Sequence, residues 1–281
     1  MASPASTDLT LTVKAELCAY AHTSRHDCWA VASIKAPLFE PETRVPIDVV
    51  AVIDESDSMA GEKLELAKKA LLFVIGQLKE WDRFSLVTYS DDYSKLGLIK
   101  MTKKNKAKAS SAVEAIRDLN GSGTNLCQGL LKGMEEIANN GGPEKAKIQA
   151  VLLLTDGVPC IGVRSIDGIL TKMMQIQNPQ GEKFPQKNFD GTVCTFGFGD
   201  DHDAHGLLTA ISTQGRGAYY YIDTNEKIPE YFAKCLDGLQ RVVGQNYSLK
   251  LEMQGDNQLN EVYASGAVNR TTPNKRYSFD K

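Results

Sequence analysis

Three short segments of this 281-residue chain carry oxygen-bearing side chains at spacings that could hold a metal ion. Asp54, Ser56 and Ser58 alternate directly after one apolar run, and Asp156 follows another. Thr124 lies between them in the sequence, just ahead of a helical pattern. Mg²⁺, Mn²⁺ and Ca²⁺ prefer carboxylate and hydroxyl oxygens, whereas zinc sites favour nitrogen and sulfur. The sequence therefore predicts a site for a hard divalent cation made by these five residues.

The expected local geometry supports a common site. Side chains at alternate positions of an extended turn face the same way, so the aspartate and the two serines of the first segment can point together. A helix that begins near Gly61 would place the positive end of its dipole beside them. Gly123 would allow close backbone approach and free Thr124 to point inward. Five such ligands, some acting through water, would leave one position of an octahedral ion open.

Other interpretations of these residues remain open. Taken alone, Asp54-x-Ser-x-Ser is equally typical of a helix N-cap followed by a polar turn. With Thr124 and Asp156 added, the main alternative is a degenerate site that keeps the fold and holds no ion. Glu55 and Asp57 are expected to face solvent and not to serve as ligands.

The elements that must position these residues alternate between strand and helix. Pro46–Asp54 and Ile148–Leu154 are continuous apolar runs, typical of strands buried on both faces. Gly61–Leu78 has apolar residues at spacings of three and four, which predicts a helix. Further strands are expected at 83–89, 94–101, 192–198 and 218–222, and further helices at 105–119, 125–138, 165–176, 203–212 and 226–243. This order predicts an α/β core at about 46–244, with a doubly wound, mostly parallel sheet covered by helices on both faces.

The two ends of the chain have a different pattern. Leu9–Leu17 and Trp29–Lys35 alternate like half-exposed strands, and Tyr247–Met253 and Glu261–Val268 do the same near the other end. We therefore expect segments 1–45 and 245–281 to form the two halves of one small β-sandwich beside the core.

The three chemical segments together resemble a known family. DESDSM after an apolar strand, SGT before a helix and TDG after a second strand look like the metal-ion-dependent adhesion site (MIDAS) of a von Willebrand factor type A (vWA) domain. The family pattern Asp-x-Ser-x-Ser, Thr, Asp falls on the five predicted ligands. PIDVVAVID, SMAGEKLELAKKALLFVIGQL and TFGFGDDHDAHGLLTAISTQGRGAYYYID are similar to the vWA modules of eukaryotic RING-type ubiquitin ligases. The similarity covers about 46–244 well and the flanks loosely.

The resemblance implies a Rossmann-like domain that binds proteins and is not an enzyme. In the family, a carboxylate from a partner protein completes the coordination of Mg²⁺ or a similar ion. The RING cysteine–histidine cluster is missing from this sequence, so ubiquitin transfer is not implied. Asp57 stands where the family often has glycine, and an acidic residue there could either tighten cation binding or repel an acidic ligand.

Composition excludes several other classes of function. With 42% hydrophobic and 24% charged residues and a net charge of −3, the chain is an ordinary globular protein without the basic excess of nucleic-acid binders. No apolar run approaches the ~20 residues that cross a bilayer. The absence of a signal peptide and of any CxxC pair among six cysteines predicts reduced thiols and a cytoplasmic location.

Enzyme motifs are also missing. GxSxG, GxxxxGK[ST] and a GxGxxG at the first strand–helix turn do not occur. A Mg²⁺-dependent phosphohydrolase is the best enzymatic alternative, but it would need Asp-x-Asp after the first strand, and Ser56 occupies the second of those positions. A vWA scaffold that works without metal is the alternative among binding proteins.

Four minor clusters have simpler structural explanations. Cys18, His22, His26 and Cys28 lack a standard zinc spacing, although zinc or a Cys18–Cys28 disulfide stays open. The acidic and histidine residues at 200–205 are expected to cap the next helix, with Asp203 as N-cap, and a second ion there is the alternative. The lysines of 103–108 predict a solvated helix face, and Tyr219–Tyr221 a packed strand.

Overall fold

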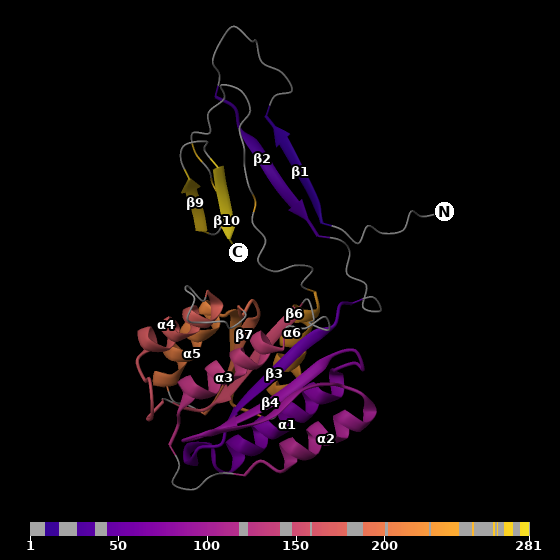
Figure 1. Ribbon diagram of the computed structural model, residues 1–281, viewed down its shortest axis with the longest axis vertical. Helices are drawn as coiled ribbons and strands as arrows, with labels where there is room; N and C mark the ends of the chain where they lie inside the picture. The colour runs from indigo at the N-terminus through magenta and orange to yellow at the C-terminus, as the bar shows by residue number, and fades with distance from the viewer. Residues whose placement is uncertain are drawn as a thin grey trace, which may run out of the picture. The chain divides into compact units, whose positions relative to one another are not determined.

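The computed structural model describes residues 9–16, 27–36, 44–117, 123–140, 148–157, 159–178, 188–199, 202–224, 226–241, 249, 261, 263, 267–271 and 276–280. Its main body is a six-stranded sheet between two layers of helices (Figure 1). The strands of this sheet are β3 (Ile47–Asp54), β4 (Arg83–Tyr89), β5 (Tyr93–Lys100), β6 (Ile148–Thr155), β7 (Thr192–Phe198) and β8 (Arg216–Ile222). The helices are α1 (Glu62–Gln77), α2 (Lys103–Glu114), α3 (Leu126–Asn139), α4 (Ile166–Gln177), α5 (His202–Gln214) and α6 (Lys227–Gln240). This architecture confirms the predicted α/β, Rossmann-like fold.

The strand order places the switch point of the sheet between β3 and β6. The order is β5-β4-β3-β6-β7-β8, and all neighbours are parallel except β4 and β5. From β3 the chain proceeds outward through β4 and β5, and then returns to the other side of β3 to build β6, β7 and β8. In open sheets of this kind, ligands bind beyond the carboxyl ends of the strands at the point where the order reverses.

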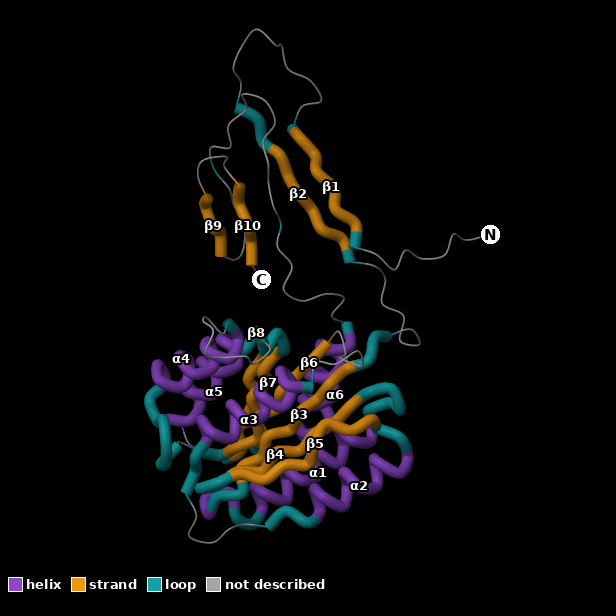
Figure 2. Tube along the Cα trace, viewed as in Figure 1, coloured by secondary structure: helices purple, strands orange, loops and turns teal. Residues whose placement is uncertain are grey.

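The two central strands are apolar along most of their length because both of their faces are buried. Val49, Ala51 and Ile53 of β3 pack with residues of α1, α2 and α6. Val50 and Val52 point to the other face and pack with α3, α4 and α5. Figure 2 shows the two helical layers on either side of the strands. The sequence pattern of apolar runs therefore follows directly from the three-layer architecture.

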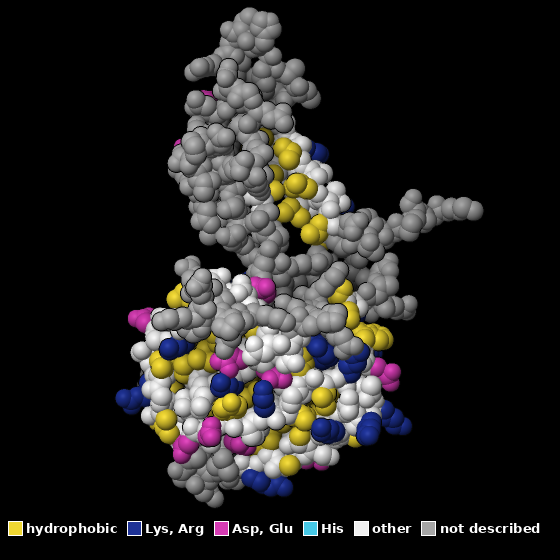
Figure 3. All heavy atoms as spheres, in the orientation of Figure 1, with side chains coloured by type: hydrophobic (Ala, Val, Ile, Leu, Met, Phe, Trp, Pro, Cys, Tyr) yellow, Lys and Arg dark blue, Asp and Glu magenta, His cyan; other side chains and the backbone are white. Residues whose placement is uncertain are grey.

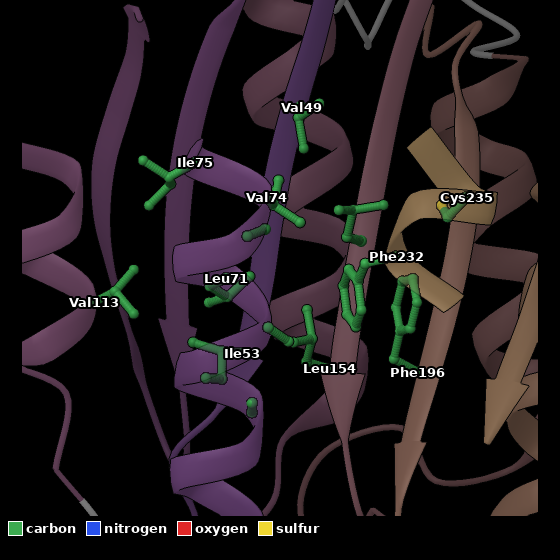
Figure 4. Packing of buried hydrophobic residues seen from close by; sticks show 14 of the residues in the cluster. Val49, Ile53, Leu71, Val74, Ile75, Val113, Leu154, Phe196, Phe232 and Cys235 are labelled. Atoms are coloured by element: carbon green, nitrogen blue, oxygen red, sulfur yellow. The ribbon is translucent and has the colours of Figure 1, made fainter. Parts of the chain in front are cut away.

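The helices bury the faces that their periodicity predicts. Leu71, Val74 and Ile75 of α1 are fully or almost fully buried against the sheet, as Figure 4 shows. On the same face, the rings of Phe196 in β7 and Phe232 in α6 stack with centroids 4.0 Å apart. These contacts join the two halves of the sheet into one core.

The described residues outside the core form two separate hairpins. β1 (Thr10–Ala15) pairs with β2 (Ala30–Lys35), and β9 (Ala267–Thr271) pairs with β10 (Arg276–Asp280), both antiparallel. The chain divides into two compact units, Met1–Arg44 and Val45–Lys281. The two strands expected near the N-terminus are confirmed, whereas the expected strand at 261–268 lies further along, at β9. Tyr247–Met253 lies almost wholly outside the described residues, and the β-sandwich stays a prediction.

None of the helices in the described ranges combines the length and the apolar character needed to cross a membrane.

Candidate metal centre

The carboxyl ends of β3 and β6 bring two of the predicted segments together. The strands are parallel and in register, with Ile53 opposite Leu154. The next residues, Asp54 and Thr155, are therefore neighbours, and the Thr155 hydroxyl donates a hydrogen bond of 2.7 Å to Oδ2 of Asp54. Thr155 was not among the predicted site residues because in the sequence it is the last residue of an apolar strand.

Asp54 is fully buried and is held by three donors. The Ser56 backbone N–H donates to Oδ1 at 3.0 Å, and the hydroxyls of Thr155 and Tyr89 donate to Oδ2. Burial raises the pKa of Asp54 because the charged carboxylate has lost its hydration. The three hydrogen bonds fix the orientation of a carboxylate that would otherwise be costly at this position.

The serines connect the first segment to Asp156. The Ser56 and Ser58 hydroxyl oxygens are 3.2 Å apart, and the Ser58 hydroxyl donates to Oδ1 of Asp156 at 2.9 Å. Ser56 and Asp156 are buried, while Ser58 is exposed. Residues 98 positions apart in the sequence thus contact each other directly.

Lys63 completes this group from the first turn of α1. Its ammonium forms an ion pair with Oδ2 of Asp156 and donates to the Ser58 carbonyl oxygen at 3.2 Å. Lys63 was not predicted as a site residue, because a lysine in the first turn of an amphipathic helix ordinarily faces solvent. The only available signal was its position five residues after Ser58, at the start of the helix that the site loop enters.

Thr124 also lies near the carboxyl ends of the central strands, and its backbone is held by the loop that follows β6. It is buried, and its carbonyl accepts hydrogen bonds from the backbone N–H groups of Cys160 and Ile161 at 3.1 and 3.3 Å. The Thr124 N–H donates to the Cys160 sulfur at 3.1 Å. These bonds tie the start of α3 to the loop that follows Asp156.

Gly123, beside Thr124, lies close to two side chains of the loop after β6. A Cβ atom at Gly123 would lie 2.3 Å from Cδ1 of Ile161 and 3.0 Å from the Cys160 sulfur. The close backbone approach expected from the sequence is therefore present, and it is an approach to the loop after β6.

The acidic neighbours of the site differ in exposure. Asp57 is exposed, as expected. Glu55 is half-buried, and burial raises its pKa, so the expectation that it faces solvent holds only in part. Its position is set by its backbone N–H, which donates to the Tyr89 carbonyl oxygen at 2.9 Å.

The minor candidates contribute little to the described structure. Cys18, His22 and His26 lie outside the described residues, and Cys28 is a free, exposed thiol. α5 begins at His202, so Asp203 lies inside the helix and the prediction that it is the N-cap was wrong. Across the described ranges, no cluster of three or more histidine, cysteine or acidic residues could hold a metal. The five cysteines in the described part of the chain form no disulfide, and their reduced state stays a prediction.

Comparison with known proteins identifies the family. Residues 48–234 match the von Willebrand factor type A domain. The chain belongs to the vWA family. The resemblance inferred from the three motifs is thereby confirmed, and vWA domains are mostly interaction modules and not enzymes.

Curated relatives include plant and animal proteins of larger size. This vWA chain is 28% identical over 223 residues to the E3 ubiquitin-protein ligase WAV3 of Arabidopsis thaliana, covering 77% of the chain and 26% of that protein. It is 34% identical over 189 residues to human inter-alpha-trypsin inhibitor heavy chain H3, covering 64% and 20%. The chain covers 48% of the Synechocystis protein sll0103, so it spans about half or less of the length of all three relatives.

Solved structures confirm the fold. A von Willebrand factor type A protein from Catenulispora acidiphila aligns with a TM-score of 0.62 at 14% identity, covering 100% of this chain and 63% of that one. The PilB minor pilin from Streptococcus sanguinis aligns with a TM-score of 0.55 at 14% identity, covering 83% and 78%.

Proposed function

We propose that this vWA domain is a divalent-cation-dependent protein-binding module that captures an acidic side chain of a partner protein. The observation that carries the proposal is the hydrogen-bonded series of Ser56, Ser58 and Asp156 beside the buried Asp54. This arrangement brings oxygen atoms that suit a hard cation together from two loops, at the point between β3 and β6 where the strand order reverses.

The residues fit a hard cation in both charge and ligand type. Asp54 and Asp156 would supply two negative charges, and the hydroxyls of Ser56, Ser58 and Thr124 would supply neutral oxygens. A bound Mg²⁺, Mn²⁺ or Ca²⁺ would supply positive charge and a position for the partner's carboxylate. Sulfur and imidazole ligands are not part of the proposed set, so zinc is not its preferred ion.

The surrounding hydrogen bonds would prepare the ligands for this role. The three donors to Asp54 hold its carboxylate in one orientation, so that little order has to be created when the ion binds. The contacts between Thr124 and Cys160 couple the threonine loop to the loop that bears Asp156. The rim around the crevice would then decide which acidic partner fits.

A metal-free scaffold is the second candidate, and one observation favours it. The Lys63 ammonium forms an ion pair with Asp156, so this carboxylate has a positively charged partner within the chain itself. The cytoplasmic location inferred from the cysteines stays a prediction in either case.

A thermal-shift titration separates the two candidates. Mg²⁺ or Mn²⁺ at about a hundred times its dissociation constant should stabilise the folded chain by ~2.7 kcal/mol and raise its melting temperature by several degrees. Asp54→Asn should abolish this rise. Asp57→Asn changes an exposed carboxylate of the same loop and should keep it. An unchanged melting temperature in the parent chain at every ion concentration would support the metal-free scaffold.

A pull-down with the full chain tests partner capture. Proteins retained with Mg²⁺ and lost with EDTA should also be lost from the Asp54→Asn chain and retained by Asp57→Asn. Hydrolysis of a generic phosphoester that needs Mg²⁺ and Asp54 would overturn the non-enzymatic assignment.

A further inference from the structure

Lys63 is a positively charged side chain placed where the proposed cation site needs a free carboxylate. Its ammonium contacts Oδ2 of Asp156, while Oδ1 of the same group accepts from Ser58. The second contact of the ammonium is to the Ser58 carbonyl oxygen at 3.2 Å. The lysine thus binds the carboxylate and the backbone of two of the proposed ligand residues.

The fold directs the Lys63 side chain into this position. Lys63 is the second residue of α1, directly after the loop that carries Ser56 and Ser58. A Cβ atom on Gly199 would lie 2.9 Å from Cε and 3.3 Å from Nζ of Lys63. Gly199 directly follows β7 and has a φ of +89°. The Lys63 side chain therefore passes close to the backbone of a glycine at the carboxyl end of β7. A residue with a side chain at this point would both strain the backbone and push the lysine away.

The charges explain why the ammonium and a divalent ion would compete. The ammonium neutralises one of the two carboxylates that the proposed function assigns to the ion. Two cations in contact with the same buried carboxylate repel each other strongly, because the surroundings screen charge less than water does. The side chain of Lys63 is 39% exposed, whereas that of Asp156 is 3% exposed, so the lysine has a route to solvent that the aspartate lacks.

We infer that Lys63 is a tethered cation that occupies Asp156 in the metal-free protein and is displaced when a divalent ion binds. The inference rests on the proposed function and adds a regulatory element to the same site. Lys63 keeps Asp156 compensated when the ion is absent, and it lowers the affinity of the site for the ion.

Calorimetric titration of the full chain with Mg²⁺ and Mn²⁺ tests the inference. Lys63→Met keeps most of the apolar stem and removes the charge. It should bind the ion at least ~10-fold more tightly than the parent chain, since a tenfold change needs only ~1.4 kcal/mol. Lys68→Met is the matched control, because Lys68 lies on the same helix and pairs with Glu65 at 2.8 Å, away from the proposed ligands. It should change the affinity less than twofold.

The outcomes separate the inference from the proposed function. Equal ion affinity in the parent chain and in Lys63→Met would overturn the inference and leave the proposed function standing. Binding by Lys63→Met alone would show that the ion does not displace Lys63 from Asp156, and would overturn both the displacement and ion binding by the parent chain. The absence of binding by every chain would overturn both.

A second measurement needs no variant and so does not depend on whether Lys63→Met folds. The parent chain is acetylated briefly with acetic anhydride, with saturating Mg²⁺ or with EDTA, and each lysine is quantified by mass spectrometry. Lys63 should be labelled more with Mg²⁺, because the displaced ammonium faces solvent. Lys132, which is 32% exposed and paired with Glu135 on α3, serves as the control and should not change. Equal or lower labelling of Lys63 with Mg²⁺ would show that it stays on Asp156 and would overturn the inference.

Discussion

The hydroxyl of Tyr89 donates a hydrogen bond to Oδ2 of Asp54 across 3.3 Å. Both side chains are fully buried, and burial raises the pKa of Tyr89, which therefore remains a donor. The Tyr89 ring packs so closely on α3 that a Cβ atom at Gly129 would lie 2.4 Å from it. Tyr89 thus links the first ligand segment to the helix that follows Thr124.

The first prediction concerns the two hydroxyl donors to Asp54. Tyr89→Phe should lower the free energy of unfolding by about 1 kcal/mol, because the aspartate loses one of its three donors. Thr155→Val should cost more, about 2 kcal/mol, because it removes the shorter bond and the acceptor of the Gly157 N–H. Urea unfolding measures both values. A larger loss for Tyr89→Phe would contradict the assigned geometry.

A pair of glycine substitutions tests the packing of α3 on Tyr89. Gly129→Ala should destabilise the chain by ~1–3 kcal/mol, because the new methyl group overlaps the buried ring. Gly238→Ala in α6 has nothing within 4 Å of the new atom and should stabilise the chain by about 0.5–1 kcal/mol. Thermal melts of both variants should therefore shift in opposite directions. A shift in the same direction would mean that α3 does not pack as described.

The buried charge of Asp54 should reduce stability when no ion is present. Burial raises the pKa of this carboxyl, which means that its charged form is unfavourable in the folded chain. Asp54→Asn removes the charge, and the Tyr89 and Thr155 hydroxyls can rotate to accept from the new amide. In EDTA, Asp54→Asn should melt about 2–4 °C higher than the parent chain. This is the shift that a gain of ~1 kcal/mol in the free energy of unfolding produces in a domain of this size. Asp57→Asn should leave it unchanged, and a lower value for Asp54→Asn would show that the buried charge is not destabilising.

At the amino ends of β3 and β4, away from the candidate metal centre, an ion pair should affect the stability of the fold but not the binding of a metal ion. Arg83 donates to both carboxylate oxygens of Asp48 at 2.7 Å, and the aspartate is buried. Asp48→Ala should cost about 3–5 kcal/mol, because it removes the carboxylate that compensates the charge of the Arg83 guanidinium. The exposed pair Lys234–Glu230 offers a control, since Lys234→Ala should change stability little. Weaker Mg²⁺ binding by folded Asp48→Ala would show coupling that the structure does not predict.

Among the described residues, the N-terminal hairpin exposes several apolar side chains on one face, and this face allows a test of the predicted β-sandwich. Leu11, Val13 and Ile34 share one face of β1 and β2, and Val13 is 66% exposed; Figure 3 shows hydrophobic side chains gathered there. Two-stranded hairpins are at best marginally stable alone, so we expect the C-terminal strands to cover this face. Val13→Lys should lower the melting temperature of the unit that contains the hairpin, whereas Thr12→Lys on the other face should not. Equal effects would argue against the sandwich.

Much of the fold and of the candidate site could be predicted from the amino-acid sequence. The long apolar runs of β3 and β6 can be buried only in a sheet with helices on both faces, because apolar residues follow one another without alternation along them. The polar residues that follow the two strands then have to lie close together, because the carboxyl ends of parallel neighbouring strands are on the same side of the sheet. Ser58 forms hydrogen bonds with both Ser56 and Asp156, which agrees with a common position at the carboxyl ends of the strands.

Other parts of the site depend on register and on contacts between distant segments. Tyr89 and Thr155 look like ordinary strand residues in the sequence, and they become donors to Asp54 only because β4 and β6 flank β3 in register. Lys63 resembles a solvent-facing helix residue until α1 places it on Asp156. Local pattern determines which face of an element is buried, since burial repeats with the period of the element. Which side chains meet at the carboxyl ends is decided by strand order, and that order is set by the packing of the whole chain.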